Sequence, residues 1–285
     1  MDPLNRQSIN SLSNAIQSRK EKVQLSKLWR HLHDEFNIGI IIKNHLVLKP
    51  IDYKSIREIV FNETGYDPIT PLPIGDRINQ SRYSGNEKLS SENPGRHHLL
   101  LNSNTSSLKI NNKQIPLLMG CSYRIDWRNL NLKKIKQVIV VENLAAFDNF
   151  QMAKIEKELR NALVLYRGHN ISTKATLDLL DALADDAHVI AFSDYDPKGI
   201  EISKTTHRVT HFLMPADPSV AFQKAEGTRE RFDKQWSAIK YITENPLPVT
   251  LTNYWDLLIK NKKCIAQELM FSSNLELKAV KFIES

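Results

Sequence analysis

The sequence lacks four features, each of which would define a class of protein. No apolar run reaches the roughly 18 residues of a membrane-spanning helix. Residues 1–20 contain no apolar core of a signal peptide, and no internal repeat is visible. The two cysteines, Cys121 and Cys264, do not have the spacing of a metal-binding motif, so we expect free thiols. We therefore expect a cytoplasmic protein that makes no membrane contact.

What is present is an ordinary globular composition. Hydrophobic residues make up 41% of the 285 positions and charged residues 25%, which excludes wholesale disorder. A chain of this length is large enough for two domains. The pattern of residue types changes after Lys133, Lys134 and Lys136, where runs of β-branched residues begin. We predict an N-terminal domain over residues 1–135 and a C-terminal domain over residues 136–285.

The positive charge is unevenly distributed along the chain. The formal net charge is +7, of which residues 1–140 carry +9 and residues 141–285 carry −2. A basic module before a slightly acidic one is typical of a DNA-binding domain joined to a carboxylate-rich catalytic domain. A solvated basic surface on a protein that binds no nucleic acid would have the same composition.

The first half reads as a mixture of helices and short strands. Apolar residues at helical spacing predict helices over residues 5–36 and 53–64. Between them, two apolar runs flank Lys43-Asn44-His45, which predicts a hairpin. This α+β mixture is compatible with a winged-helix domain. Further strands are expected at 98–101, 107–110 and 115–119, with a turn at Asn111-Asn112.

The second half alternates strands and helices. Continuous apolar runs at 138–141, 163–166 and 188–192 predict strands buried on both faces. This alternation predicts an α/β domain with a Rossmann-like parallel sheet and flanking helices. Helices are expected over 146–161, over 173–185 with Ser172 as the cap, and from Pro197 onward.

Carboxylates follow two of these strands. Glu142 comes directly after the first, and Asp194 and Asp196 follow the third. The carboxyl ends of parallel strands meet at one edge of a sheet, so we expect the three side chains to converge there. Converging carboxylates repel one another unless a cation lies among them, and Mg²⁺ prefers oxygen ligands. The sequence therefore predicts a Mg²⁺ or Mn²⁺ site at this edge.

Each of these residues also has a purely structural explanation. Asp196 followed by Pro197 is an ordinary helix N-cap and first helical position. Glu142 alone could be a surface carboxylate at a strand end. Capping and metal binding are compatible, because an aspartate has two oxygens. The metal site therefore depends on the set of three rather than on any one residue.

The two acidic segments resemble the two motifs of a Toprim domain. The resemblance covers about residues 136–205. It is closest to the branch that contains the topoisomerase VI A subunit, the related meiotic double-strand-break protein and the JetD nuclease subunit of Wadjet anti-plasmid systems. In that branch one strand ends in Glu and a later strand ends in Asp-x-Asp-Pro-x-Gly. The matching residues here are Glu142 after the first strand and Asp194-Tyr195-Asp196-Pro197-Lys198-Gly199 after the third.

The resemblance implies catalytic and metal-binding roles for Glu142, Asp194 and Asp196, with proton transfer as another role for Glu142. Gln267-Glu268 is similar to a Gln-Glu pair late in the Wadjet nucleases, and an exposed helical pair is the alternative. We expect Lys198 to contact a DNA phosphate, because it begins a helix whose N-terminus favours anions. Arg167, His169 and Lys174 are further candidates for DNA binding at the same sheet edge.

The family offers two nucleophiles. In the topoisomerase branch a tyrosine in a basic context attacks the phosphate, and in the Wadjet branch the resemblance implies hydrolysis by water. Four tyrosines of the first half were considered, and none matches the tyrosine motif. They are Tyr53, Tyr66, Tyr83 and Tyr123, with Ser81-Arg82-Tyr83 the nearest approach.

The leading hypothesis is a Mg²⁺-dependent hydrolase that cleaves double-stranded DNA. It would be the nuclease subunit of a Wadjet-like anti-plasmid defence system, working with an SMC-like ATPase complex. A homodimer would present one site to each strand. The alternatives are a topoisomerase VI A-like tyrosine transesterase, a non-catalytic DNA-binding assembly subunit and a primase-like enzyme. The intact Glu and Asp-x-Asp speak against the assembly subunit, and Asp-Pro-x-Gly speaks against the primase.

Overall fold

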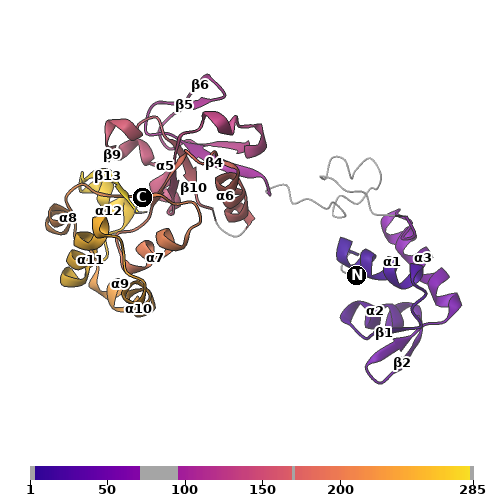
Figure 1. The fold of residues 1–285 in the computed structure, drawn as a ribbon. Helices are drawn as coiled ribbons and strands as arrows, with labels where there is room; N and C mark the ends of the chain where they lie inside the picture. Colours follow the sequence, from indigo (N-terminus) through magenta and orange to yellow (C-terminus); the bar gives the residue numbers. More distant parts are fainter. Residues whose placement is uncertain (1–3, 71–95, 169–170, 283–285) are drawn as a thin grey trace. The chain divides into compact units, whose positions relative to one another are not determined.

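The chain forms two compact units, shown in a computed structural model that describes residues 4–70, 96–168 and 171–282 (Figure 1). The units comprise Met1–Pro94 and Gly95–Ser285, and each is described by itself. Within the described ranges, no helix is both long enough and apolar enough to cross a membrane. Tyr83 and His169 lie outside the described residues.

Over residues 4–70, the N-terminal unit packs three helices with a three-stranded antiparallel sheet of order β1-β3-β2. The expected hairpin is present, and Lys43 in its turn has a φ of 55°. The core is formed by side chains such as Leu12, Leu32 and Leu46, which are fully buried. The elements are α1 (Arg6–Gln17), β1 (Lys22–Gln24), α2 (Lys27–Phe36), β2 (Ile40–Ile42), β3 (His45–Val47) and α3 (Pro50–Thr64).

The prediction of one helix over residues 5–36 is wrong in its middle. Helix α1 ends at Gln17, and residues 22–24 form strand β1 instead. Val23 is buried there and pairs with Leu46 of β3. Ser26 then caps a new helix, its hydroxyl accepting the backbone N–H of Trp29. Val23 therefore has the spacing of a helical residue but lies in a strand, and its side chain faces the same core.

The C-terminal unit is built on an eight-stranded mixed sheet of order β7-β4-β10-β8-β11-β12-β13-β9. The four central strands, β10, β8, β11 and β12, are parallel. The strand bounds are β4 (His98–Asn102), β7 (Tyr123–Asp126), β8 (Gln137–Val141), β9 (Lys154–Ile155), β10 (Leu163–Tyr166), β11 (His188–Phe192), β12 (His211–Pro215) and β13 (Glu276–Lys281). The predicted α/β class and its three parallel strands are confirmed, and antiparallel strands extend the sheet on both sides.

The order of the parallel strands fixes where a ligand site can lie. In chain order β8 comes first, yet it lies between β10 and β11. From β8 the chain reaches β10 on one side through β9, and from β10 it crosses back past β8 to form β11 on the other side. A doubly wound sheet binds its ligands at the carboxyl ends of the strands where this reversal occurs. That point is the end of β8 and β11, which is where the chain places its strand-end carboxylates.

The connection from β8 to β10 differs from the predicted helix over 146–161. Only α5 (Leu144–Asp148) is α-helical, and two single 3-10 turns follow at Phe150–Met152 and Lys157–Leu159. Between those turns, β9 pairs with β13 at the far edge of the sheet. Ile155 is buried by this pairing, which explains an apolar position that the sequence suggested was helical.

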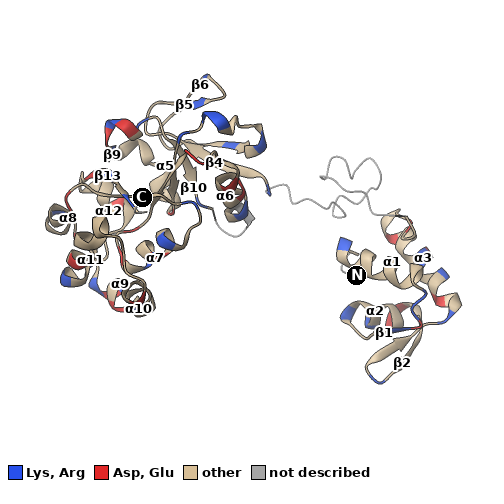
Figure 2. Ribbon diagram, viewed as in Figure 1, with Lys and Arg blue, Asp and Glu red and all other residues tan. Residues whose placement is uncertain are grey.

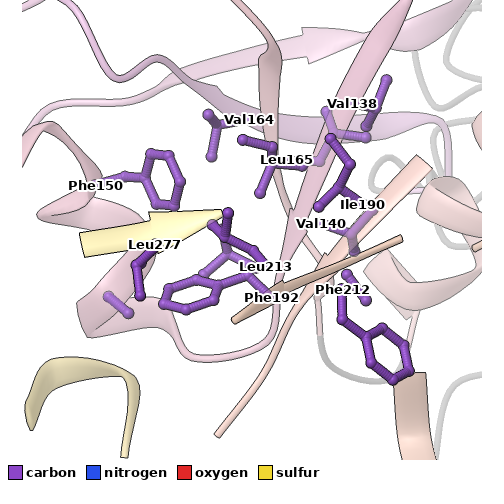
Figure 3. Close-up of a cluster of buried hydrophobic side chains, with 14 of the residues drawn as sticks. Val138, Val140, Phe150, Val164, Leu165, Ile190, Phe192, Phe212, Leu213 and Leu277 are labelled. Carbon is purple, nitrogen blue, oxygen red and sulfur yellow. The ribbon is translucent and has the colours of Figure 1, made fainter. Parts of the chain in front are cut away.

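The core of this unit lies against the parallel strands (Figure 3). Val140, Leu165 and Ile190 come from three neighbouring strands, and each is nearly or fully buried. The ring of Phe150 packs edge-on against that of Phe192 at a centroid distance of 6.0 Å. This apolar layer holds the ends of β8 and β11 in a fixed register, in which Val141 is paired with Phe192.

Helices and a hairpin complete the unit. Helix α6 packs near β4, and α7 packs against α10 (Figure 1). The hairpin formed by β5 (Ser107–Ile110) and β6 (Lys113–Pro116) turns at Asn111 and Asn112, both with positive φ, as predicted. The helices are α6 (Ile171–Ala182), α7 (Pro197–Thr205), α8 (Pro218–Lys224), α9 (Arg229–Asp233), α10 (Trp236–Glu244), α11 (Val249–Asn261) and α12 (Gln267–Ser272).

The boundary between the units lies at residues 94–95 rather than near residue 135. Strands β4 and β7 precede residue 135, but they pair with one another and with β10 in the large sheet. The distribution of charge changes accordingly. Residues 1–94 carry only +2 of the net charge, and residues 95–140 carry +7. The basic excess therefore belongs to the C-terminal unit, including the β5–β6 hairpin and the segment before β8 (Figure 2).

Candidate functional site

Glu142, Asp194 and Asp196 lie at the same edge of the large sheet. The strands that precede them are adjacent and parallel, and the backbone N–H of Glu142 donates to the carbonyl of Phe192 at 3.0 Å. The charges of both aspartates reach Glu142 and raise its pKa. The structure thus places the three carboxylates that the sequence suggested at one edge of the sheet, where the strand order reverses, within range of one another's charge.

Glu142 is partly buried beside a guanidinium. Burial is the main cause that raises its pKa, and the charge of Arg167 acts in the opposite direction. The Arg167 Nη2 lies 3.8 Å from Glu142 Oε1, and its backbone N–H donates to the carbonyl of Val141. Among the described residues, the buried Nε of Arg167 has no hydrogen-bond partner. Arg167 therefore lies at the carboxylate edge, as expected, with part of its donor capacity unused.

Asp196 is the N-cap of α7, so its structural explanation is correct. Its Oδ1 accepts the backbone N–H of Gly199 at 2.7 Å, and Pro197 occupies the first helical position. The side chain is only 2% exposed. Its second oxygen, Oδ2, accepts the side-chain amide of Gln235 at 2.8 Å. Capping therefore uses one oxygen and leaves the other directed at neighbours in the site.

Gly199 allows this turn to close. A Cβ built on Gly199 would lie 2.2 Å from the carbonyl oxygen of Asp194, far inside any real contact. The glycine of the Asp-Pro-x-Gly motif is therefore required because the start of α7 passes directly over the backbone of Asp194.

Arg231 is a site residue that the sequence reasoning missed. Its Nη2 lies 2.6 Å from Asp194 Oδ2 and 3.4 Å from Asp196 Oδ2. The hydrogen bond to Asp194 is the main cause that raises the pKa of Arg231. Arg231 comes from α9, which carries no recognisable motif. No spacing signal links it to aspartates that lie more than 30 positions earlier.

Gln267 holds the ends of the two strands together. Its Oε1 accepts the backbone N–H of Asn143 at 2.8 Å, and its Nε2 donates to the carbonyl of Phe192 at 2.6 Å. Its own backbone N–H donates to Asp194 Oδ1 at 2.9 Å. Gln267 is fully buried whereas Glu268 is exposed, so the exposed-pair explanation holds only for Glu268.

The predicted DNA-binding cations occupy different surroundings. Lys198 is half exposed and its Nζ pairs with Glu201 at 2.7 Å, while its backbone N–H donates to Gln235. Lys174 is exposed on α6, where it pairs with Asp178 one turn later. Of the three candidates that the structure describes, only Arg167 is in direct range of a site carboxylate.

The donor set suits a hard divalent cation, but the carboxylates are not gathered into a finished site. Three carboxylates at one edge are the oxygen ligands that Mg²⁺ and Mn²⁺ prefer. Over the ranges that the structure describes, no group of three or more His, Cys, Asp or Glu side chains is assembled closely enough to hold a metal ion. Arg231 supplies the positive charge beside the two aspartates instead.

Comparison with known proteins adds a family but no activity. Residues 96–279 match the profile of a family described as "Domain of unknown function (DUF7281)". The match begins where the C-terminal unit begins and covers its sheet from β4 into β13. No curated protein matches the chain.

Proposed function

The chain belongs to the DUF7281 family, a domain of unknown function, and we propose that it is a metal-dependent DNA endonuclease of Toprim type that hydrolyses phosphodiesters. One observation carries the proposal. Glu142, Asp194 and Asp196 follow two adjacent parallel strands and lie at the edge of the sheet where the strand order reverses. The resemblance of the two segments to Toprim motifs supports the same conclusion.

Glu142, Asp194 and Asp196 would hold Mg²⁺ or Mn²⁺. A bound divalent ion neutralises phosphate charge and helps to activate a water nucleophile. The protein side chains divide the remaining work. Gln267 fixes the ends of the strands, and Asp196 holds the start of α7. The raised pKa of Glu142 supports its alternative role in proton transfer, because efficient acid–base groups titrate nearer to neutral pH.

DNA would approach the carboxylate edge along Arg167, Lys198 and Lys174. Arg167 lies beside Glu142, and Lys198 stands in the first turn of α7, whose N-terminus attracts anions. Lys198→Ala should weaken DNA binding and lower its salt dependence by about one ion. His169 remains a candidate outside the described residues.

A plasmid-nicking assay tests the proposal. Wild type should nick DNA with Mg²⁺ or Mn²⁺, and Glu142→Ala should reduce the rate on the order of 100-fold. Glu158→Gln, a change at an exposed carboxylate, is the control and should cleave like wild type. Equal cleavage by wild type and Glu142→Ala would contradict the assignment of Glu142.

Hydrolysis is proposed over tyrosine transesterification because no tyrosine is in a motif context. The hydroxyls of Tyr66 and Tyr123 donate to backbone carbonyls within their own units. Tyr195 lies next to the aspartates, but it is fully buried and its hydroxyl donates to the carbonyl of Tyr254. A covalent protein–DNA adduct on a denaturing gel would favour the topoisomerase VI A-like alternative.

The proposed partners extend from the resemblance. A Wadjet-like nuclease subunit would act as a homodimer on double-stranded DNA delivered by an SMC-like ATPase complex. The three helices and small antiparallel sheet of the N-terminal unit support a winged-helix role in DNA binding, although residues 1–94 carry only +2. Gel-filtration mass and co-purification with the products of neighbouring genes test these partners.

A second function is favoured by one specific observation. Arg231 pairs with both aspartates, which would neutralise them permanently in a non-catalytic DNA-binding or assembly subunit. Such a protein would bind DNA equally well with and without divalent ions. Calorimetry with Mn²⁺ separates the two functions, because only the nuclease requires binding at the aspartates.

A further inference from the structure

The two aspartates differ in how fully their oxygens are used. Asp196 Oδ1 accepts from Gly199, and its Oδ2 accepts from Gln235. Asp194 Oδ1 accepts the backbone N–H of Gln267. In the described part of the chain, Asp194 Oδ2 accepts from Arg231 alone. This oxygen is therefore the one that a cation could take without breaking the scaffold of the site.

Arg231 is more exposed to solvent than the two aspartates that it contacts, so it can move away from Asp194 Oδ2. Its side chain is 48% exposed, whereas the side chains of Asp194 and Asp196 are 17% and 2% exposed. The guanidinium can turn into solvent, where hydration replaces its contacts with the aspartates, so its release costs little free energy. Arginine stays protonated at all relevant pH values, so a cation must displace it by competition rather than wait for it to lose charge.

The charges of the site favour such an exchange. Three carboxylates (Glu142, Asp194 and Asp196) and two guanidiniums (Arg167 and Arg231) leave one net negative charge at this edge. A divalent cation concentrates twice the charge of Arg231 in a smaller volume and accepts several oxygen ligands at once.

We propose that Arg231 is a displaceable counter-cation, which occupies Asp194 Oδ2 until a divalent ion replaces it. The inference rests on the proposed metal site and adds to it a residue that the two acidic motifs do not contain. Arg231 is thus a positioning residue that sets the affinity of the site for metal. Removing its charge should tighten metal binding, which is the opposite of the effect of removing a metal ligand.

The test is calorimetric titration of the full chain with Mn²⁺. Arg231→Gln should bind Mn²⁺ roughly two- to fivefold more tightly than wild type, in line with the loss of a half-exposed competing ion pair. Arg231→Lys keeps the charge and should stay near wild type. Arg229→Gln is the matched control, since Arg229 is an exposed arginine on the same helix that pairs with Asp233 and not with the site.

A thermal melt gives a second readout that does not depend on cleavage. Saturating Mn²⁺ should raise the melting temperature of Arg231→Gln more than that of wild type, because tighter binding stabilises the folded state further. This comparison also shows whether the variant folds. Asp194→Asn should abolish the Mn²⁺ response in both backgrounds.

The outcomes separate the two proposals. If Arg231→Gln binds Mn²⁺ as wild type does, or more weakly, the counter-cation role is wrong and the metal site stands. If neither protein binds Mn²⁺ while both remain folded, the proposed metal site is wrong and the inference falls with it. Tighter binding by Arg231→Gln, with Arg229→Gln unchanged, supports both.

Discussion

Gly199 lies directly above the backbone of Asp194, so that a single added carbon on Gly199 would come within 2.2 Å of the Asp194 carbonyl oxygen. Packing therefore requires a glycine at position 199, five residues after Asp194. It sets the position from which α7 begins, and with it the orientation of the capping Asp196. The glycine thus serves the site without contributing a side chain.

Gly199→Ala should destabilise the C-terminal unit by about 1–3 kcal/mol, the usual cost of forcing an extra carbon into a packed region. The change also moves Asp194 or α7, so nicking should fall with stability. Chemical denaturation monitored by circular dichroism measures the free energy of unfolding. Lys198→Ala, one position earlier and half exposed, should change it by less than about 0.5 kcal/mol. A fully stable Gly199→Ala would show that the turn can relax.

Gln267→Leu should cost about 1–3 kcal/mol, because the change leaves the N–H of Asn143 without its partner and removes one of the two hydrogen bonds to the carbonyl of Phe192, which keeps the one from Glu142. The ends of β8 and β11 would lose their bridge, so metal binding should weaken as well. Denaturant unfolding and Mn²⁺ calorimetry measure the two effects. The exposed neighbour provides the control, since Glu268→Ala should leave stability within about 0.5 kcal/mol of wild type. An unchanged unfolding midpoint for Gln267→Leu would contradict the bridging role.

A fragment of residues 95–285 should fold alone, whereas a fragment of residues 136–285 should not. The shorter fragment lacks β4 and β7, so the edge of β10 is left unpaired and the core loses the buried side chains of Leu99 and Leu101. Cooperative thermal unfolding of the two fragments is the measurement. A cooperative transition for residues 136–285 would restore the boundary near residue 135.

Cys264 should resist thiol reagents in the folded protein, while Cys121 should react. Burial, aided by the charge of Asp196, raises the pKa of Cys264 from 9.0 to about 12, and the thiolate is the reactive form. Cys121 is exposed. Mass spectrometry after brief labelling should show one modification under native conditions and two after denaturation. Native labelling of Cys264 at the rate of Cys121 would contradict the packing around Asp196.

The same shift in pKa predicts alkaline destabilisation. The pKa of Cys264 is raised in the folded chain, so the folded state is favoured while the thiol is protonated. As the pH rises from about 9 towards about 12, the unfolded chain loses this proton first and unfolding becomes easier. Cys264→Ala should reduce this part of the pH dependence, which denaturant midpoints at pH 8 and pH 11 would measure.

The site was partly predictable because local sequence determines strand ends. Val138 to Val141 and Val189 to Phe192 are uniform apolar runs, and the carboxylates follow them within a few residues. Arg231, Gln235 and the bridging function of Gln267 depend on contacts between segments far apart in the chain. Their local surroundings contain ordinary charged and polar residues, so no spacing rule could select them.

The fold was least predictable where a buried apolar residue fits the pattern of a helix and also that of a short strand. Val23 and Ile155 fit a helical pattern, but each is buried as part of a short strand that pairs with a distant one. The net charge counted over residues 1–140 also gave a wrong prediction of which unit is basic. Lys133, Lys134 and Lys136 stand before β8 in the C-terminal unit, so a count over the first half assigned them to the wrong module.

The pairing of β9 with β13 can form only late in synthesis of the chain. β9 leaves the ribosome early, inside the connection between β8 and β10, yet its partner is the last strand described. Gln267 also comes from this late region. The carboxylate edge of a nascent chain therefore stays open until nearly the whole unit has been synthesised. If the protein is the nuclease that we propose, its site would form only after most of the C-terminal unit has been synthesised.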